Sequence, residues 1–562
     1  MSEAPQIDRP LVVAELNESF VTQRGLPLIV HLLGIAALLS IVMVWLGPGR
    51  FTIDESAYLT QADALADGSF GIDYPTAGVI EQNTLAPLAL SQTFETGWTP
   101  YSRHPLYPIL IAEAQGVSPQ HGAVLLSIAG SLMAAVGIGR IRFWLDGGSP
   151  VIAMWAAALL SPLTIHSQVV WAHTLSIGVA AVAIALALDA ATAPSRWLVR
   201  VVGAALALAV AAFLRTEGPF VALALVAALW FVPELSRRRW LIMSGLVLGV
   251  VGIAAGLDRL WSQSIVDGSP TTLPGPKSVA SSLLADRVSG SVNLFMNVGG
   301  GGPMSMLWLL VPLLLVIAWT KTRGSAPDTG MVKVLCGGAV MSAAAAATVT
   351  QTLSGWLPAM PMVAVALLAS VGDRRSRPML VLVACLTGLV VATVPAGGGG
   401  LGWGGRYLLL SLPAVAALAV VSCDRMWREG LGKVIVAAGL IATVLVQING
   451  LRVLDRNHDT SVQVEAMLDE VMQEFASDQV LVAPDIRIGR TAPKSAMEAP
   501  LLSPADLVQL PAVMDLVRAA GIDSVVFIEL VDFDAADIPP GWRLGSEREN
   551  GPVRTRLVLL DD

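Results

Sequence analysis

The sequence predicts a polytopic α-helical membrane protein of about 13 transmembrane helices, followed by a small α/β domain in the C-terminal part. Two features of the composition and one of the pattern predict it. Of the 562 residues, 54% are hydrophobic and only 14% are charged, whereas soluble proteins carry about 25% charged residues. The mean hydropathy is +0.67. Apolar runs of roughly 17–25 residues, long enough to cross a bilayer as helices, recur along most of the chain.

The predicted spans begin after residue 26. Residues 1–26 are polar and mixed in charge, without the Lys/Arg start of a signal peptide, and predict a cytoplasmic tail. Residues 27–450 then form the transmembrane domain. Its spans are placed at residues 27–47, 120–139, 150–165, 174–193, 200–214, 218–234, 240–258, 304–320, 333–350, 358–372, 378–395, 407–422 and 433–450.

Lys and Arg residues indicate which side of the membrane each loop faces. Positive charges concentrate in cytoplasmic loops, and here they occupy every second loop. We therefore expect the N-terminus in the cytoplasm and, because the number of spans is odd, the C-terminus outside the cytoplasmic (plasma) membrane. The basic loops contain Arg140 and Arg142, Arg196 and Arg200, Arg237–Arg239, Lys321 and Arg323, Arg374, Arg375 and Arg377, and Arg425, Arg428 and Lys433.

Two long loops are predicted on the outer side. Residues 48–104 form the first, and the apolar stretch Pro105–Gln115 that follows it is too short to cross a bilayer. We predict that this stretch is a juxtamembrane helix packed on the outer surface. The second, residues 261–303, is rich in Ser, Gly and Pro and predicts a flexible, lid-like loop.

The last 112 residues, 451–562, differ in character from the spans. Short β-branched runs at residues 479–483 and 524–528 predict strands. Between them, residues 505–520 have helical periodicity, and the pattern stops at Gly521. This order predicts an extracytoplasmic α/β domain.

An acidic pair lies just outside the first span, in the stretch Phe51-Thr-Ile-Asp54-Glu55-Ser-Ala-Tyr58. Charged side chains at the membrane of an apolar chain are costly and typical of functional sites. One carboxylate would serve as a general base, and a helix starting here would place Tyr58 on the same face as Asp54. Alternatively, Asp54 caps the helix and Glu55 favours its first turn. Both interpretations can hold together.

Basic residues occur at three further outer positions. Arg103 and His104 precede the short apolar helix and would bind an anionic head group, or else anchor the chain at the interface. Arg215 and Glu217 lie in a tight hairpin at membrane depth, where Arg215 could alternatively extend to lipid phosphates. Arg406 follows a glycine-rich run that lets backbone approach a ligand closely, which suits phosphate binding. The alternative is a flexible turn with an interfacial arginine.

Several other functional classes are not indicated. His166 and His173 flank an outer turn, but a lone histidine in apolar surroundings is more often structural than a ligand. Cys336, Cys385 and Cys423 lie in or beside apolar runs and are interpreted as small buried hydrophobes. No basic cluster suggests a nucleic-acid partner. No metal or cofactor motif occurs, so we expect that no cofactor is required, although carboxylates leave a divalent metal open.

The chain resembles the GT-C glycosyltransferases over residues 27–450, in particular the branch of the protein O-mannosyltransferases and the lipid A aminoarabinose transferases. In that family the first outer loop opens with an acidic pair followed by tyrosine and closes with a His/Lys-Pro-Pro-Leu-like motif. Here the second proline of that motif is absent. The matching stretches are Asp54-Glu55 with Tyr58, His104-Pro105-Leu106-Tyr107, Leu214–Gly218 and Trp403–Tyr407.

The resemblance implies an inverting transfer of sugar from a polyprenyl-phosphate donor to an acceptor hydroxyl of a glycan, lipid or protein. Asp54 would remove the proton of the acceptor hydroxyl, with Glu55 or His104 orienting Asp54 or the acceptor. The departing phosphate and its growing charge would be held by arginines. The residues expected to bind substrate are Tyr58, Arg103, His104, Arg215, Glu217 and Arg406.

Two rival functions remain at this point. A transporter or flippase of lipid-linked sugars, also surrounded by membrane lipids, would share the apolar groove and the arginines, but it would not need the acidic pair. It should also carry polar residues near mid-membrane, and the predicted spans have almost none. The third possibility is a non-catalytic scaffold whose C-terminal domain binds polymer or protein.

Overall fold

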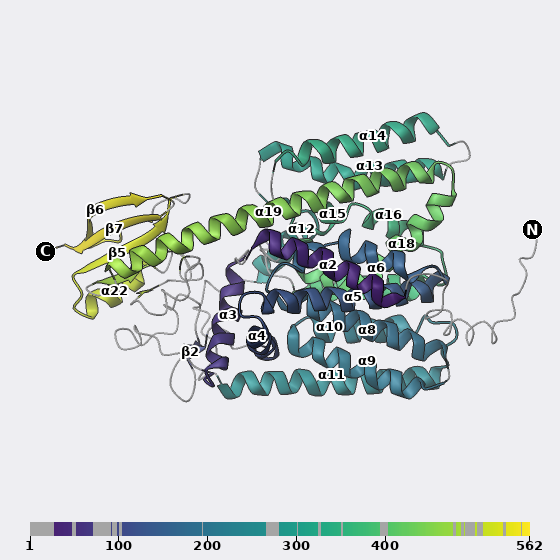
Figure 1. The fold of residues 1–562 in the computed structure, drawn as a ribbon, viewed down its shortest axis with the longest axis horizontal. Coiled ribbons are helices and arrows are strands. Elements are labelled where there is room, and N and C mark those ends of the chain that lie inside the picture. Colours follow the sequence, from purple (N-terminus) through teal and green to yellow (C-terminus); the bar gives the residue numbers. More distant parts are fainter. Residues whose placement is uncertain are drawn as a thin grey trace, which may run out of the picture.

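The computed structural model shows a bundle of helices whose long axes run in a common direction, with a small sheet domain at one end (Figure 1). We call that end of the bundle the sheet-domain end and the opposite one the arginine-rich end. The structure describes residues 27–47, 52–70, 91–92, 98–99, 104–193, 195–265, 280–299, 302–323, 327–349, 352–393, 403–475, 479–484, 488, 501–502, 510–531, 536–551 and 553–561.

The predicted membrane architecture is confirmed. Within the described residues, nine helices are long and apolar enough to cross a membrane. Each corresponds to one predicted span. They are α2 (Leu28–Leu46), α5 (Gly122–Asp146), α8 (Ala172–Thr192), α9 (Trp197–Leu214), α11 (Arg237–Ile265), α13 (Leu307–Thr322, after η2, Gly302–Met306), α14 (Thr329–Ala346), α18 (Leu412–Arg428, after the 3-10 helix η3, Arg406–Ser411) and α19 (Gly432–Phe475).

The other four predicted spans are also helical, but they are shorter or interrupted. Proline, which lacks an N–H group, lies at both interruptions: Pro162 separates α6 from α7, and Pro361 separates α15 from α16. Short helices of this kind reach only part of the way across a bilayer. The elements are α6 (Pro150–Leu159), α7 (Leu163–His166), α10 (Gly218–Leu229), α15 (Trp356–Ala359), α16 (Val363–Ser370) and α17 (Arg377–Thr393).

Two helices lie at the sheet-domain end without crossing the bundle. They are α3 (Ile53–Ala66), in the first outer loop, and α4 (Leu106–Val117), at the predicted juxtamembrane stretch; Figure 1 shows α3 running across the direction of α2. Tyr107 and Ile111 of α4 are buried, so the short helix is anchored by its apolar face. The first outer loop also contains a two-stranded ladder, β1 (Ser91–Gln92) with β2 (Trp98–Thr99).

The second outer segment contains a helix where we predicted a flexible loop. Residues 280–296 form α12 (Ala280–Met296), and α11 continues as far as Ile265. Leu294 is buried, and the ring of Phe295 meets that of Trp356 edge to face, with centroids 6.0 Å apart. This packing favours helix in spite of the Ser and Gly content of the segment, because tertiary contacts supply most helix stability in proteins. The loop prediction is therefore wrong for these residues.

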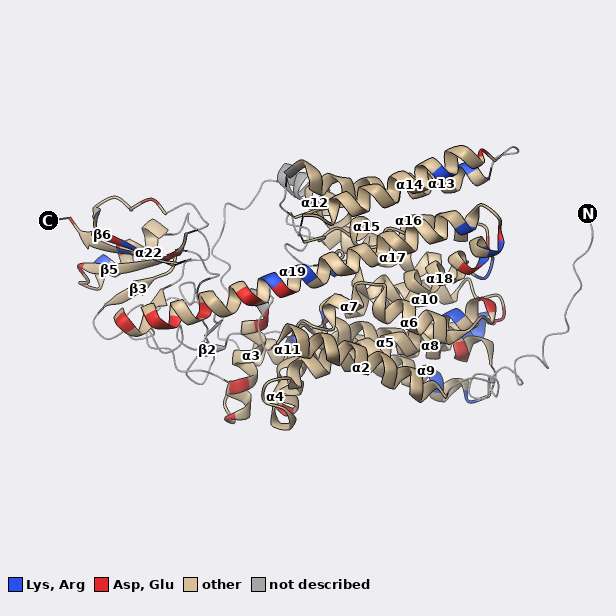
Figure 2. Ribbon diagram, turned by 45° about the horizontal axis from the view of Figure 1, so that its top comes forward, with Lys and Arg blue, Asp and Glu red and all other residues tan. Residues whose placement is uncertain are grey.

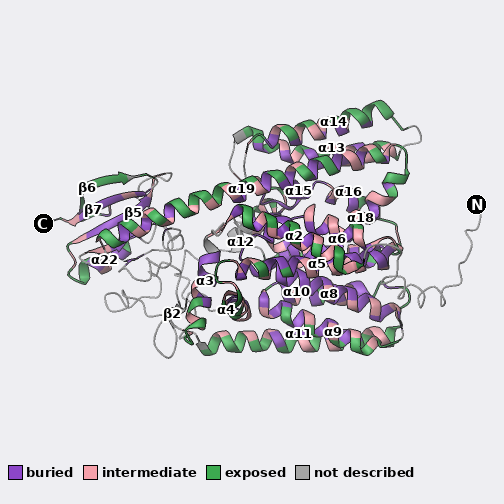
Figure 3. Cartoon of the chain, viewed as in Figure 1, coloured by how far each residue is buried: buried purple, intermediate pink, exposed green. Residues whose placement is uncertain are grey.

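Helix α8 is the centre of the bundle. In the 18-residue apolar window of α8, 83% of the residues are buried, against 28% for α11 and α14; Figure 3 shows the exposed faces on those outer helices. Glycines let α5 approach α8 closely. A Cβ on Gly130 would overlap the backbone of Leu175, and a Cβ on Gly178 would overlap the backbone of Gly130. Such close backbone contact is typical of helix pairs in membranes.

The predicted C-terminal sheet domain is present. Its five strands have the order β4-β3-β5-β7-β6, with β3 parallel to both β4 and β5, and β7 antiparallel to both β5 and β6. Helix α22 (Leu510–Ala519) matches the predicted helix, and Gly521 after it has a φ of +77°. The strands are β3 (Val480–Val482), β4 (Leu501–Leu502), β5 (Ser524–Leu530), β6 (Trp542–Asn550) and β7 (Val553–Leu560).

Helix α19 joins the bundle to this domain. It is continuous for 44 residues and therefore passes residue 450, where we placed the domain boundary. Its last turns pack on one face of the sheet through Val464, Leu468 and Val471. Helix α22 packs on the other face. The sheet is thus covered on both sides, and one of the two covers is an extension of a spanning helix.

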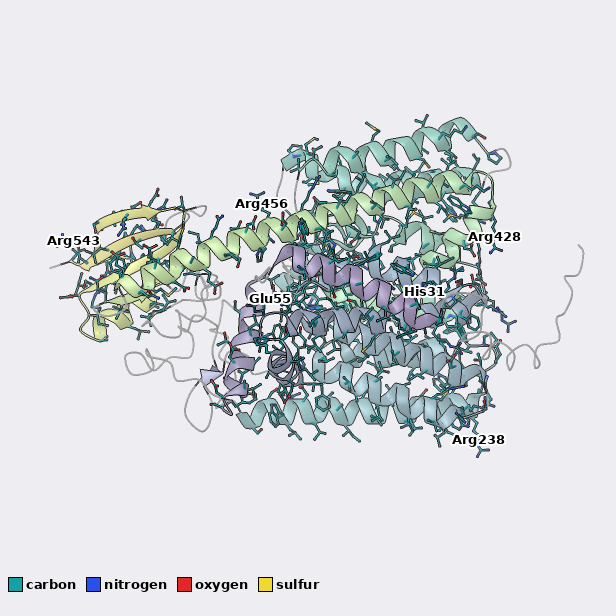
Figure 4. The ribbon with its side chains drawn as sticks, viewed as in Figure 1. His31, Glu55, Arg238, Arg428, Arg456 and Arg543 are labelled. Atoms are coloured by element: carbon teal, nitrogen blue, oxygen red, sulfur yellow. The ribbon has the colours of Figure 1, made fainter. Side chains whose placement is uncertain are left out.

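Positive charge gathers at one end of the bundle (Figure 2). Three of the four ion pairs there join different segments of the chain, which ties the helix ends together where charges are still tolerated, and the fourth, Arg428 with Asp424, lies within α18. Figure 4 labels Arg238 and Arg428 at this end and Glu55 at the other. The pairs are Arg140 with Asp189 (3.0 Å), Arg142 with Asp424 (3.1 Å), Arg425 with Asp373 (2.7 Å) and Arg428 with Asp424 (2.9 Å).

The distribution of arginines makes the orientation testable. Ser69, after α3, and Arg238, at the start of α11, are both exposed and lie at opposite ends of the bundle. In intact cells we expect a membrane-impermeant thiol reagent to label Ser69→Cys but not Arg238→Cys, with Arg375→Cys as a second cytoplasmic position. Labelling of positions 69 and 238 from the same side would contradict the orientation.

Candidate active site

The acidic pair lies at the start of α3, in a turn that Glu55 closes. The backbone N–H of Thr52, the N-cap residue, donates to Glu55 Oε1 at 2.6 Å. The other oxygen, Oε2, accepts from the backbone N–H of Val170 at 2.9 Å, in the segment before α8. Glu55 is fully buried. Its carboxylate therefore fixes the start of α3 to a segment more than a hundred residues away.

Asp54 occupies the second position of this helix, between Thr52 and Glu55. Its side chain lies outside the part of the chain that the structure describes, as does the whole of Arg103. The residue that caps the helix is Thr52. Asp54 therefore stands inside the first turn, where a negative charge is favourable, and the bonds of its neighbour Glu55 hold its backbone at the sheet-domain end.

Tyr58 connects α3 to α4. It is buried, and its ring meets the ring of Tyr107 nearly perpendicularly, with the centroids 5.1 Å apart. Edge-to-face pairs of this kind are favourable beyond the area they bury. Asp54 and Tyr58 are one helical turn apart, as predicted, and Tyr58 holds the two short helices together.

His104 begins the segment that leads into α4, with a φ of +52°. This left-handed conformation is uncommon outside glycine and is often found at functional sites. Nδ1 lies 3.1 Å from Asp258 Oδ2, near the end of α11, and Nε2 lies 3.2 Å from Thr216 Oγ1. The end of the first outer loop is thus tied to α11 and to the α9–α10 turn.

The same turn contains the predicted pair Arg215 and Glu217. Arg215 Nε donates to Glu217 Oε2 at 3.0 Å and Nη2 donates to Oε1 at 2.8 Å. Burial opposes the charged carboxylate, but Arg215 holds the pKa of Glu217 below its usual value by charge attraction and hydrogen bonding. The turn therefore presents a two-bond ion pair, which is geometrically specific.

A tight turn places Arg406. Gly404 and Gly405, which precede it, have φ values of +68° and +63° and donate backbone hydrogen bonds to the carbonyls of residues 353 and 354, at 2.8 and 2.6 Å. Side chains rarely adopt this conformation, so glycine is required here. At these two glycines the backbone closely approaches other parts of the chain, and the predicted approach to a ligand stays a prediction. The glycines at 397–400 and 402 lie outside the described residues.

The guanidinium of Arg406 packs on aromatic rings. It lies over Trp171, 5.6 Å from the ring centroid, and over Tyr407, at 5.2 Å. Cation–π contacts of this kind hold a guanidinium in place without neutralising its charge. Arg406 therefore lies beside the segment that Glu55 binds, because Trp171 directly follows Val170.

His166 and His173 flank Trp171 in the sequence, and in space the three rings form one cluster in which each contacts the other two. The ring centroids are 5.6 Å apart for His166 and Trp171, 5.7 Å for the two histidines, and 4.9 Å for Trp171 and His173. All three side chains are buried. His166 Nε2 lies 2.9 Å from the carbonyl oxygen of Trp403, so this ring cluster also contacts the turn that places Arg406.

The predicted residues thus meet in two groups. Glu55 and Arg406 contact the adjacent residues Val170 and Trp171. His104 contacts Thr216, which stands between Arg215 and Glu217.

Three residues of this region were not predicted from the sequence. Asp258 gave a signal that we did not use, since it is a charge at the outer end of an apolar run. Trp171 lies between two histidines at an interface position, where tryptophan is common. Thr216 gave no signal. Among the described residues, no group of three or more His, Cys, Asp or Glu side chains is arranged to hold a metal ion.

Known structures share this architecture. ArnT from Cupriavidus metallidurans matches with a TM-score of 0.50 at 12% sequence identity, over 94% of this chain and 97% of that one. ArnT, a lipid A aminoarabinose transferase, is a member of the GT-C superfamily. The chain has the GT-C fold. The predicted resemblance is therefore confirmed at the level of fold, and the chain is a multi-pass membrane protein.

Two further matches have lower scores. ArnT bound to undecaprenyl phosphate matches with a TM-score of 0.47 and 11% identity, over 94% of this chain and 97% of that chain. The archaeal oligosaccharyltransferase AglB from Archaeoglobus fulgidus, in complex with an inhibitory peptide and a dolichol-phosphate, matches with a TM-score of 0.47 and 12% identity, over 88% and 69%. No family model matches the sequence, and no curated protein does.

The role of Glu55 as an anchor can be tested by Glu55→Gln. The amide would face the N–H of either Thr52 or Val170 with its NH₂ group, so one buried donor loses its acceptor. We expect a loss of about 1–3 kcal/mol in stability, the usual cost of an unsatisfied buried donor, measured by thermal unfolding in detergent. The control is Glu113→Gln on the exposed face of the adjacent α4. Equal unfolding temperatures of the two variants would show that Glu55 is no anchor.

Proposed function

We propose that the protein is a membrane glycosyltransferase that moves a sugar from a polyprenyl-phosphate donor to an acceptor hydroxyl. The transfer takes place at the outer face of the membrane and inverts the anomeric configuration. Asp54 is the general base, and Arg406 and Arg215 bind the donor phosphate. The acceptor is a hydroxyl of a glycan, lipid or protein. The fold supports the class of reaction, since ArnT is a membrane transferase.

One observation carries the proposal. Glu55 hydrogen-bonds to Val170, and Arg406 lies over the ring of the next residue, Trp171. The first turn of α3, which contains Asp54 and Glu55, and the side chain of Arg406 therefore contact consecutive residues of one segment. A transferase with a phosphate leaving group needs this combination: a base for the attacking hydroxyl and a cation for the departing oxygen, both fixed before substrate binds.

The proton and the charge then move as follows. The acceptor hydroxyl gives its proton to the Asp54 carboxylate, and its oxygen forms a bond to the anomeric carbon. The bond from that carbon to the phosphate oxygen breaks on the opposite face, so the configuration inverts. The leaving polyprenyl phosphate gains one negative charge, which Arg406 and Arg215 offset, with Arg103 as a further candidate.

Glu55, His104 and Glu217 serve as positioning residues in this scheme. Glu55 fixes the turn that carries Asp54. Glu217 fixes the guanidinium of Arg215 through two hydrogen bonds. His104 orients the α9–α10 turn through Thr216, and Tyr58 supports α3 through its contact with Tyr107.

The role of Asp54 is tested by Asp54→Asn. Asparagine keeps the size of the side chain and is well tolerated at the start of a helix, so the protein should fold and bind donor. Transfer of sugar should fall by about 10²–10⁴-fold, as is usual for the loss of a general base. The rate is measured with purified protein in lipid vesicles and a radiolabelled polyprenyl-phosphate sugar. Glu55→Gln should cost less activity per folded molecule.

The matched control is Asp67→Asn, an exposed carboxylate at the other end of α3. It should transfer at the wild-type rate. If Asp54→Asn is as active as Asp67→Asn, Asp54 is not the base. A flippase predicts a different result, because movement of the lipid-linked sugar across the vesicle membrane would then survive the loss of the Asp54 carboxylate.

The role of Arg406 is tested by Arg406→Ala and Arg406→Lys. Alanine removes the charge and should weaken binding of undecaprenyl phosphate, whereas lysine should rescue it only partly, because it lacks the planar fork and the stacking of guanidinium on Trp171. Binding is measured by native mass spectrometry. Arg456→Ala, an exposed arginine of α19 labelled in Figure 4, is the control for loss of charge. Wild-type affinity in Arg406→Ala would exclude it as a phosphate ligand.

A further inference from the structure

Four ring nitrogens of the cluster beside Arg406 are buried without a hydrogen-bond partner. They are Nδ1 of His166, Nε1 of Trp171, and both Nδ1 and Nε2 of His173. Each side chain is at least 95% buried, with exposed fractions of 1%, 4% and 5%. The absence of partners refers to the described part of the chain.

Such a cluster is costly for a folded protein. Nearly all buried polar groups have partners, and each group left without one costs on the order of 1–3 kcal/mol. Here three adjacent rings, at centroid distances of 4.9–5.7 Å, carry such nitrogens beside the candidate site. Groups of this kind persist where a ligand completes them.

The hydrogen-bonding pattern indicates the chemistry of that ligand. The carbonyl of Trp403 can only accept, so a neutral His166 carries its proton on Nε2 and presents the lone pair of Nδ1. Trp171 Nε1 can only donate, and a neutral His173 offers one donor and one acceptor. The cluster therefore combines donors with acceptors. Sugar hydroxyls, which donate and accept, match such a mixture.

Charged ligands match the cluster less well. Arg406 lies over Trp171, and the positive field of its guanidinium reaches the neighbouring rings. This positive field disfavours a metal cation among the rings. A phosphate would meet the lone pair of His166 Nδ1, which repels an anion, and it has Arg406 beside the cluster as a better partner. The phosphate of a donor and the sugar joined to it thus fit neighbouring places.

We propose that His166, Trp171 and His173 bind the hydroxyl groups of the donor sugar and so determine which sugar is transferred. The inference rests on the proposed function, because it places the donor phosphate at Arg406. In a sugar linked directly to phosphate, the ring begins at the next atom. The ring of Trp171, whose centroid is 5.6 Å from Arg406 Cζ, is thus next to the guanidinium that would bind the phosphate.

His173→Phe tests the proposal. The change removes both ring nitrogens and keeps an aromatic ring of similar size. Native mass spectrometry would compare undecaprenyl phosphate with undecaprenyl-phosphate-mannose and undecaprenyl-phosphate-glucose, in wild type and variant. We expect the affinity for the sugar-linked lipid that wild type prefers to fall roughly 2- to 12-fold for each hydrogen bond lost. The affinity for undecaprenyl phosphate itself should not change.

Thermal stability supplies a second readout. Because His173→Phe removes unpaired buried nitrogens, its unfolding temperature should equal or exceed that of wild type. The control, His31→Phe, removes a histidine whose Nδ1 accepts from Trp155 Nε1 at 3.2 Å. We expect His31→Phe to lower the unfolding temperature and to leave the preference among the three lipids unchanged.

The outcomes separate this inference from the proposed function. If wild type does not bind undecaprenyl phosphate, the proposed function is wrong. If it binds that lipid but no sugar-linked form more tightly, or if His173→Phe loses affinity for all three lipids equally, the sugar site is wrong. A structure of the donor complex in which these nitrogens bond only to water would also overturn it.

Discussion

The carboxylate of Glu55 is the interaction on which the outer part of the molecule depends. It accepts a hydrogen bond from Thr52 within its own helix and a second from Val170, at the start of the segment that leads into α8. Hydrogen bonds to a charged acceptor are strong, and a buried carboxylate without them would be very unfavourable. The two hydrogen bonds, which both require the Glu55 carboxylate, therefore constrain the position of the start of α3. Among the nine helices long enough to cross a membrane, α8 has the largest buried share. The bond to Val170 therefore fixes the position of the acidic turn relative to the centre of the bundle.

The membrane explains why the site forms where helices end. In the bilayer, helix association relies on close packing of small residues, as at Gly130 and Gly178, and spans contain few polar groups. The polar groups that chemistry requires are then restricted to the ends of helices, where backbone groups also lack intrahelical partners. His104, Arg215 and Arg406 all stand at such ends. The tightly packed bundle thus holds the polar residues in fixed positions at the ends of its helices and not in its interior.

Hydropathy predicted the spans because it is a local property, carried by each apolar run alone. It failed at α12, where burial of Leu294 and packing of Phe295 on Trp356 outweigh a loop-like composition. The candidate site was predictable in residue types but not in partners. Glu55 and Val170 are 115 positions apart, and no sequence pattern near either residue predicts the hydrogen bond between them. His173 was interpreted as a structural histidine with its hydrogen bonds satisfied, yet both its nitrogens are without partners among the described residues. Pairings of this kind arise only from tertiary structure.

The continuity of α19 has a mechanical consequence. Residues 451–475 span about 38 Å at the rise of an α-helix, and no hinge interrupts them. The length of α19 therefore determines both the rotation of the sheet domain about the helix axis and its distance from the bundle. One residue inserted between Thr460 and Val464 would turn the domain by about 100° around the helix axis and displace it by about 1.5 Å. Insertion or deletion of single residues in this helix can therefore change the orientation of the sheet domain relative to the bundle during evolution, without altering either part.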